Sequence, residues 1–221
     1  MKTFQEFLAE SRGNKYELTS ETIRWNGNTL YQIKALKSFG GVRAGDLGGY
    51  IQSEKNLSQN GNCWVSEKGK VYDNAHVSGN AKVYGAALVY KDATVSDNAE
   101  VYNRAVVADN AQVYDNAHVF GRGKVFNKAK VFGSAQVYGD GEVYHKAQVS
   151  GNAQIYGESE VAHNAHVYGN AKVFGNSSVY ADSKVFGNAE VSGFTKVQGR
   201  STVSGNAVLS GKDRVSDEDI V

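Results

Sequence analysis

The sequence has no proline, a single cysteine (Cys63), and no apolar run approaching the ~18 residues that a membrane-spanning helix needs. One cysteine cannot form an intramolecular disulfide, and this usage is typical of a reducing compartment. The N-terminus also lacks the apolar core of a secretory signal peptide. We therefore expect neither a membrane partner nor a disulfide framework.

The chain also has little excess of charge of either sign, with 24 Lys plus Arg against 23 Asp plus Glu. This balance predicts no nucleic-acid partner, and it equally argues against an acidic mimic of DNA. The glycines are not spaced as in a phosphate-binding loop, so we expect no nucleotide cofactor, and no other cofactor is predicted.

A six-residue repeat dominates what the sequence does contain. Every sixth residue from Val65 to Val215 is valine except Ile155 and Leu209, and no insertion breaks the register. Two residues before each of these stands a small residue, most often alanine, until Asp213 interrupts the rule. Gly-Asn and Asp-Asn pairs between the units supply residues that tolerate a positive φ.

This repeat predicts an all-β fold, a parallel β-helix. Residues two apart in an extended segment point to the same side, so Val and Ala would both face inward. Three strand-and-turn units close a triangle of 18 residues, and the repeat region would form about eight such coils. The repeat resembles that of the hexapeptide β-helix family, whose coils are left-handed, whereas parallel crossovers are generally right-handed. The resemblance therefore implies the left hand.

We divide the chain into four segments. Residues 1–10 precede the cap, and residues 11–60 form a small N-terminal β cap with a hairpin turning at Asn26-Gly27. Residues 61–215 form the β-helix. Residues 216–221 are a tail, and the charged stretch from Lys212 to Asp219 would blunt the exposed strand edge.

Residues 18 apart should lie directly above one another, so the position after each core valine sorts into three outer columns. Only one column is an uninterrupted row of aromatic residues, which we call the aromatic strip: Tyr84, Tyr102, Phe120, Tyr138, Tyr156 and Phe174. A contiguous aromatic row is typical of an interface with a protein partner, a glycan or another subunit. The alternative is that the rings only stabilise neighbouring coils.

A corner column consists almost entirely of asparagine. Its members are Asn80, Asn98, Asn116, Ser134, Asn152, Asn170, Asn188 and Asn206. Stacked asparagine amides can hydrogen-bond along the axis, which predicts a structural ladder.

Catalytic and metal-ligating residues are sparse. His145 and His163 share a corner column with Asp109, so a metal site is conceivable, but exposed corner histidines favour plain solvated side chains. Cys63 stands where the repeat has a small, inward-facing residue. This favours a buried apolar side chain that fills space in the core over a catalytic nucleophile. Hexapeptide acyltransferases resemble this chain in the repeat, yet they use a loop extruded from the coil, and here no loop interrupts the repeat. We therefore predict no catalytic residues and lean against an enzyme.

The cap and coil together resemble the YdcK-type family, over roughly residues 16–210. The motifs are Leu30 to Leu36, Ala44 to Leu47, Gly48-Gly49-Tyr50-Ile51 and Gly61-Asn62-Cys63-Trp64-Val65, followed by NAxV repeats. The resemblance implies a left-handed β-helix and, as an alternative function, an acyl-CoA-dependent acyltransferase.

The first ten residues, MKTFQEFLAE, resemble the capsid-targeting peptide of internal head proteins in T-even-type phages. In that family a head-maturation protease cuts after Glu in a Leu/Ile-x-Glu motif. Leu8, Ala9 and Glu10 match this motif, and the small Ser11 follows. The resemblance implies packaging in the virion and cleavage after Glu10; an ordinary amphipathic N-terminal helix is the alternative.

These observations lead to one expected function. The protein would be a non-enzymatic internal head protein of a phage that binds a host or phage partner, for example to counter a host defence. Its partners would be the head-maturation protease and scaffold, an unknown host protein, and other copies of the chain as a dimer or trimer. It would be located in the virion and then in the host cytoplasm. A structural virion component is the further alternative.

Overall fold

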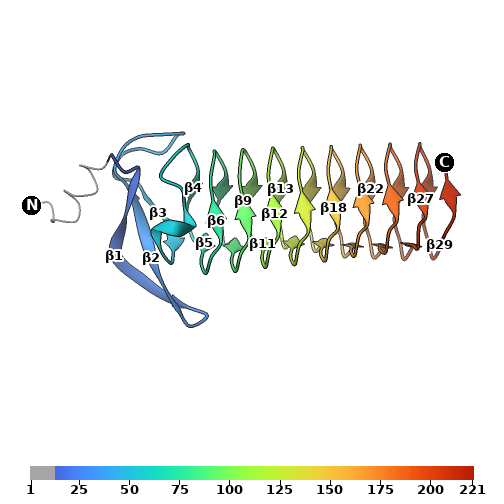
Figure 1. The fold of residues 1–221 in the computed structure, drawn as a ribbon, viewed down its shortest axis with the longest axis horizontal. Helices are drawn as coiled ribbons and strands as arrows, with labels where there is room; N and C mark the ends of the chain where they lie inside the picture. The colour runs from blue at the N-terminus through green and yellow to red at the C-terminus, as the bar shows by residue number, and fades with distance from the viewer. Residues whose placement is uncertain (1–12) are drawn as a thin grey trace, which may run out of the picture.

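The computed structural model describes residues 13–221 and shows an all-β rod of stacked triangular coils with a hairpin at its N-terminal end (Figure 1). The coils form a left-handed parallel β-helix of about 10 turns, which confirms the predicted fold class. The sequence suggested about eight coils, so the stack is longer than expected. Residues 1–12, which include the predicted processing peptide, lie outside the described residues.

Three sheets run the length of the rod, and each is named here after its first strand from the repeat. The β4 sheet contains β4 (Trp64–Val65), β7 (Lys82–Val83), β10 (Glu100–Val101), β13 (His118–Val119), β16 (Gln136–Val137), β19 (Gln154–Ile155), β22 (Lys172–Val173), β25 (Glu190–Val191) and β28 (Val208–Leu209). The β6 sheet contains β6 (His76–Val77), β9 (Thr94–Val95), β12 (Gln112–Val113), β15 (Lys130–Val131), β18 (Gln148–Val149), β21 (His166–Val167), β24 (Lys184–Val185), β27 (Thr202–Val203) and β30 (Asp219–Ile220).

The β5 sheet joins the coil to the cap. It contains β1 (Tyr16–Trp25), β2 (Asn28–Ala35), β3 (Leu47–Ile51), β5 (Lys70–Val71), β8 (Leu88–Val89), β11 (Val106–Val107), β14 (Lys124–Val125), β17 (Glu142–Val143), β20 (Glu160–Val161), β23 (Ser178–Val179), β26 (Lys196–Gln198) and β29 (Arg214–Ser216). The 3-10 turn η1 (Glu54–Asn56) lies between β3 and β4. Among the strands of residues 13–221, only β1, β2 and β3 are linked by antiparallel pairing, and β3 then pairs parallel with β5.

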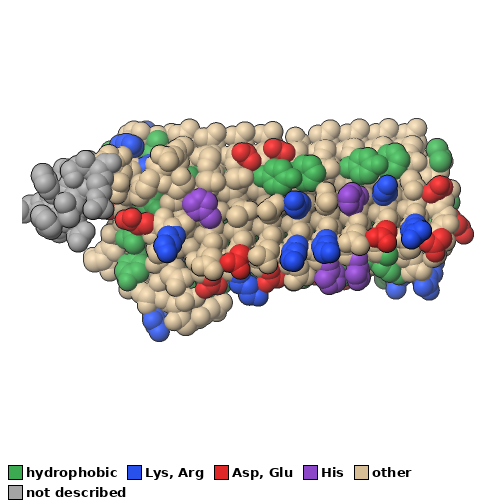
Figure 2. All heavy atoms as spheres, in the orientation of Figure 1, with side chains coloured by type: hydrophobic (Ala, Val, Ile, Leu, Met, Phe, Trp, Pro, Cys, Tyr) green, Lys and Arg blue, Asp and Glu red, His purple; other side chains and the backbone are tan. Residues whose placement is uncertain are grey.

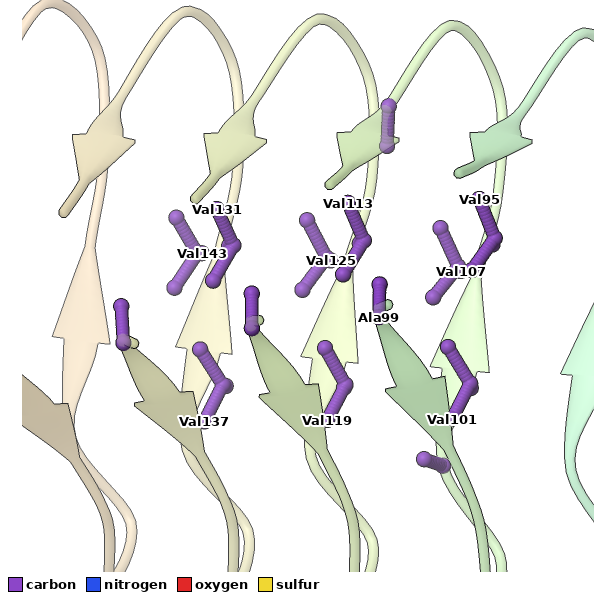
Figure 3. Packing of buried hydrophobic residues seen from close by; sticks show 14 of the residues in the cluster. Val95, Ala99, Val101, Val107, Val113, Val119, Val125, Val131, Val137 and Val143 are labelled. Atoms are coloured by element: carbon purple, nitrogen blue, oxygen red, sulfur yellow. The ribbon is translucent and has the colours of Figure 1, made fainter. Parts of the chain in front are cut away.

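The pairing register follows the repeat. From β4 to β29 each strand pairs with the strand 18 residues away, as in Glu100 with His118 and Val101 with Val119. The valines point into the rod in columns, which Figure 3 shows for the coils from Val95 to Val143. Alanine occupies the other inward position because the triangle leaves little space there, and Val101 and Ala99 both have no exposed surface.

Serine replaces alanine at several inward positions without leaving its hydroxyl unpaired. The Ser159 hydroxyl donates to the Tyr156 carbonyl at 2.9 Å, and the Ser177 hydroxyl donates to the Phe174 carbonyl at 2.8 Å. A buried hydroxyl is tolerated when such a partner is present. This explains why the small-residue rule accepts serine as well as alanine.

The asparagine ladder is confirmed. Within each run of asparagines the side-chain amide donates to the amide oxygen one coil further on, for example from Asn80 to Asn98 and from Asn170 to Asn188, both at 3.0 Å. Two such runs extend along the corner, and Ser134 separates them.

The predicted hairpin is also confirmed, because β1 and β2 pair antiparallel around Asn26 and Gly27, whose φ angles are 46° and 80°. The coil extends past both boundaries that we drew at residues 61 and 215. It begins with β3 and an isolated parallel bridge between Leu57 and Val77, and it ends with β30. These segments lack the six-residue period, so only their pairing with the neighbouring coil identifies them.

Candidate functional site

The aromatic strip lies on the outer surface of the β4 sheet, where each ring follows a two-residue strand. Its five consecutive ring pairs stack face to face, with centroids 4.8–5.0 Å apart and planes within 5° of parallel. The coil spacing therefore places the rings at stacking distance without further adjustment. The six residues form one continuous stack, as their spacing of 18 predicted.

The rings of the strip are half-buried. Inside the stack each ring covers the faces of its neighbours, so a partner would meet the ring edges. Burial, with a smaller effect of the nearby Glu100, raises the pKa of Tyr102, and burial also raises the pKa of Tyr138. A glycan that packs on an open aromatic face would find no free face in the middle of this stack. Within the stack only the ring edges are left for contact with any partner.

A polar column runs beside the strip on the same sheet. The Tyr84 hydroxyl donates to Glu100 at 2.9 Å, and Lys82 forms an ion pair with the same carboxylate at 3.1 Å. Burial alone would raise the pKa of Glu100, but the hydrogen bonds from Lys82 and Tyr84 leave it below its ordinary value. Lys172 and Glu190 form a second ion pair at 2.8 Å. The strip is thus an aromatic row beside a polar column that carries ion pairs near both ends and the neutral Gln136 and Gln154 in the middle.

The other two outer columns carry shorter aromatic stacks. On the β6 sheet, Tyr114 stacks on Phe132 and Tyr168 on Phe186, with Ser150 between the two pairs. Figure 2 shows one side of the rod, where short hydrophobic groups alternate with charged side chains of both signs. In the part of the chain that the structure describes, only the β4 sheet carries an uninterrupted row of six aromatic residues.

The histidines give no sign of a metal centre. The rings of His145 and His163 lie 4.5 Å apart at an open corner, as their shared column predicted. Asp109, in the same column, is occupied by Lys91 at 2.6 Å and by the Asn127 amide at 3.0 Å. Within residues 13–221 no three His, Cys, Asp or Glu residues converge as a metal-binding group.

Cys63 is fully buried, as expected for an inward filler, and it contacts a buried lysine that the sequence did not indicate. The Lys15 ammonium donates to the Cys63 carbonyl at 2.9 Å and to the thiol sulfur at 3.2 Å, and it also reaches the Asn60 and Gly61 carbonyls at 3.4 Å. Burial lowers the pKa of Lys15, while Cys63 acts in the opposite direction. A lysine next to a hairpin strand reads as exposed in sequence, so no sequence signal identifies this contact.

The cap and the first coils enclose a hollow of about 390 Å³ at the start of the β4 sheet. Gly40, Leu47, Asn62, Trp64 and Lys82 contribute to its lining. From Trp64 to Ser216 the two- and three-residue strands follow each other without an extruded loop. A cleft of the kind that acyltransferases build from such a loop is therefore lacking in this part of the chain.

No family model matches the chain, and no curated protein matches it. In the part of the chain that the structure describes, no helix has the length and apolar character required to cross a membrane. The class that the fold defines is a hexapeptide-repeat left-handed β-helix, and its distinguishing surface feature is the aromatic strip.

Proposed function

We propose that this protein is a non-enzymatic binding protein of a phage, packaged in the head through residues 1–10 and released into the host cytoplasm with the DNA. There it would bind a host protein through the aromatic strip, for example to counter a host defence. The observation that carries the binding proposal is the strip itself, a straight row of six half-buried rings on one sheet.

The rod suits binding because it is ordered before the partner arrives. Hydrogen bonds connect each coil to the next, such as Tyr102 N to the Val119 carbonyl at 3.0 Å and Phe120 N to the Val137 carbonyl at 2.9 Å. A surface held in this way loses little conformational entropy on association. Aromatic residues are enriched at the centres of protein interfaces, where their edges and polar tips both find contacts.

An acyltransferase has less support. Hexapeptide acyltransferases place a histidine in a cleft, but His145 and His163 lie on an open corner. A structural virion component is the third possibility. It predicts stable homotrimers and an intact N-terminus, so the two experiments below distinguish it from the proposed binding protein.

Changing Tyr102, Phe120 and Tyr138 together to serine should leave the coil folded but abolish partner binding or self-association. Each lost ring pair weakens stacking by roughly 0.5–1.5 kcal/mol, which shortens the stack without removing any inward-facing residue. The measurements are circular dichroism for the fold, light scattering for the oligomeric state, and capture of host proteins by the immobilised rod.

The matched control changes Tyr114, Phe132 and Tyr168, on the β6 sheet, to serine. This control should retain every association of the unmodified protein. If the strip variant also retains them while folded, the rings serve only the stability of the coil, and the proposed binding surface is wrong.

Packaging is tested by the mass and N-terminal sequence of the protein taken from purified virions of the phage that encodes it. A chain that begins at Ser11 inside the particle would support cleavage after Glu10 and packaging. Full-length chain in infected cells combined with its absence from virions would contradict both, and would return the YdcK-type resemblance and its acyltransferase alternative to first place.

A further inference from the structure

Lys15 and Cys63 form a buried pair of reactive side chains where the cap meets the first coil. The two residues are only 1% and 0% exposed, and the Lys15 side-chain nitrogen lies 3.2 Å from the Cys63 sulfur. Lys15 directly precedes β1 and Cys63 directly precedes β4, so the contact joins the cap to the coil. The pair contains no residue of the aromatic strip, so its chemistry does not depend on the proposed function.

The orientation of the thiol leaves its sulfur open to the lysine. The Cys63 thiol has the carbonyls of Ser58 and Asn60 as its acceptors, at 3.5 and 3.7 Å. The Lys15 nitrogen approaches the same sulfur more closely than either carbonyl does. The fold therefore holds a nitrogen in contact with the sulfur before any reaction, which removes most of the entropic cost of joining the two atoms.

The surroundings of Lys15 favour the reactive form of its side chain. An amine is a nucleophile only when it is neutral, and desolvation favours that form of a lysine. Burial lowers the pKa of Lys15; Cys63 opposes this effect, and the positive charge of Lys37 adds to it. The share of neutral amine at Lys15 is therefore larger than at an exposed lysine of the same chain.

An oxidised Cys63 has few other reaction partners. Peroxide converts a thiol to a sulfenic acid, which then condenses with a second thiol or with a nearby nitrogen. Cys63 is the only cysteine of the chain, so the chain offers no second thiol. The backbone nitrogen of the next residue, Trp64, already donates to the Ala81 carbonyl at 3.0 Å, so it is not free to close a ring. The Lys15 nitrogen is the partner that remains.

We propose that hydrogen peroxide links Lys15 to Cys63 through a sulfenamide bond, which fixes the cap covalently to the first coil. Peroxide first oxidises the thiol to a sulfenic acid, and one water leaves. The neutral amine then attacks the sulfur: the N–S bond forms, the S–O bond breaks, and the hydroxyl leaves with an amine proton as a second water. The sulfur is oxidised by two electrons and the peroxide is reduced by two. The pair lies at the end of the solenoid, where local opening costs least and admits a small uncharged oxidant.

The test treats the folded full chain with millimolar hydrogen peroxide and follows its mass. The linked protein should weigh two hydrogens less than the untreated chain, and dithiothreitol should restore the original mass. Trypsin should release residues 13–24 joined to residues 56–68, because a linked Lys15 is no longer a cleavage site. Recovery of Cys63 as a free thiol, or as a sulfinic or sulfonic acid without a bond to Lys15, would overturn the proposal.

Stability and variants locate the link. The linked protein should melt about 5 °C higher than the reduced one, because a bond between residues 15 and 63 constrains the unfolded chain. Lys15→Arg keeps the positive charge but offers no amine, so it should not form the link. Lys37→Arg, the matched control at an exposed lysine, should form it normally.

The same treatment in urea should oxidise Cys63 without linking it to Lys15, because unfolding separates the two side chains. Equal linkage in urea, or a link in Lys15→Arg, would show that the folded contact does not direct the reaction. An unchanged melting temperature of the linked protein would contradict the proposed hold on the cap.

Discussion

Replacing Lys15 with alanine is expected to lower the free energy of unfolding by about 3 kcal/mol, although sequence alone would place this lysine on the surface. Its ammonium is buried and donates to the Cys63 carbonyl at 2.9 Å, with the Asn60 and Gly61 carbonyls at 3.4 Å. Removing a buried donor leaves its acceptors without a partner, at a cost of roughly 1–3 kcal/mol, and loss of the buried stem adds to that. Urea denaturation followed by circular dichroism measures the change.

Two further variants separate these contributions. Lys15→Met keeps the apolar stem but not the hydrogen-bond donors. If the hydrogen bonds dominate, its free energy of unfolding should fall by nearly as much as that of Lys15→Ala. Lys55→Ala, at an exposed position in the 3-10 turn, should change stability by no more than about 0.5 kcal/mol. A Lys15→Met protein as stable as the unmodified chain would show that the ammonium is not needed to hold the cap against the first coil.

A second large effect is expected at a corner glycine. Gly151 has a φ of +67°, and a Cβ added there would lie 2.9 Å from both the backbone nitrogen and the carbonyl oxygen of Gly169. A β-branched side chain is strongly disfavoured in this left-handed region. Gly151→Val should therefore destabilise the rod by about 3 kcal/mol, measured by denaturant unfolding.

The matched change is Gly151→Asp. Asp115 occupies the same corner column with a φ of 58°, and its carboxylate accepts a hydrogen bond from the backbone nitrogen of Gly133 at 3.0 Å. An aspartate at position 151 can accept from Gly169 in the same way, so its effect should stay within about 1 kcal/mol. Equal losses for valine and aspartate would mean that crowding by any side chain, and not the backbone conformation, decides what this corner tolerates.

The coil is the part of the fold that sequence reasoning predicted best. Val and Ala two residues apart, repeated every six residues, already specify which side chains point inward. The same arithmetic of 18 residues per coil predicted the asparagine ladder and the stacking of His145 on His163, and both are observed. Strict repetition makes each contact local to neighbouring coils, so the sequence pattern translates directly into structure.

The candidate site was predictable only in part. The spacing placed the residues from Tyr84 to Phe174 in one row. It did not show whether their rings lie with their faces open to solvent or stack face to face on one another. The tertiary structure decides this, because ring orientation depends on side-chain torsions and on partners such as Glu100 for the Tyr84 hydroxyl. The interface role of the strip stays a prediction.

By itself, the sequence determined the period, the inward columns, the corner residues and the order of side chains along each outer face. All of these follow from a repeat whose contacts are between neighbouring coils. Only the tertiary structure decided where the coil begins and ends, because β3 and β30 lack the repeat and join it by pairing with strands far along the chain. It also decided that Lys15 is buried against Cys63. This contact depends on how the cap closes over the first coil, which no local pattern specifies.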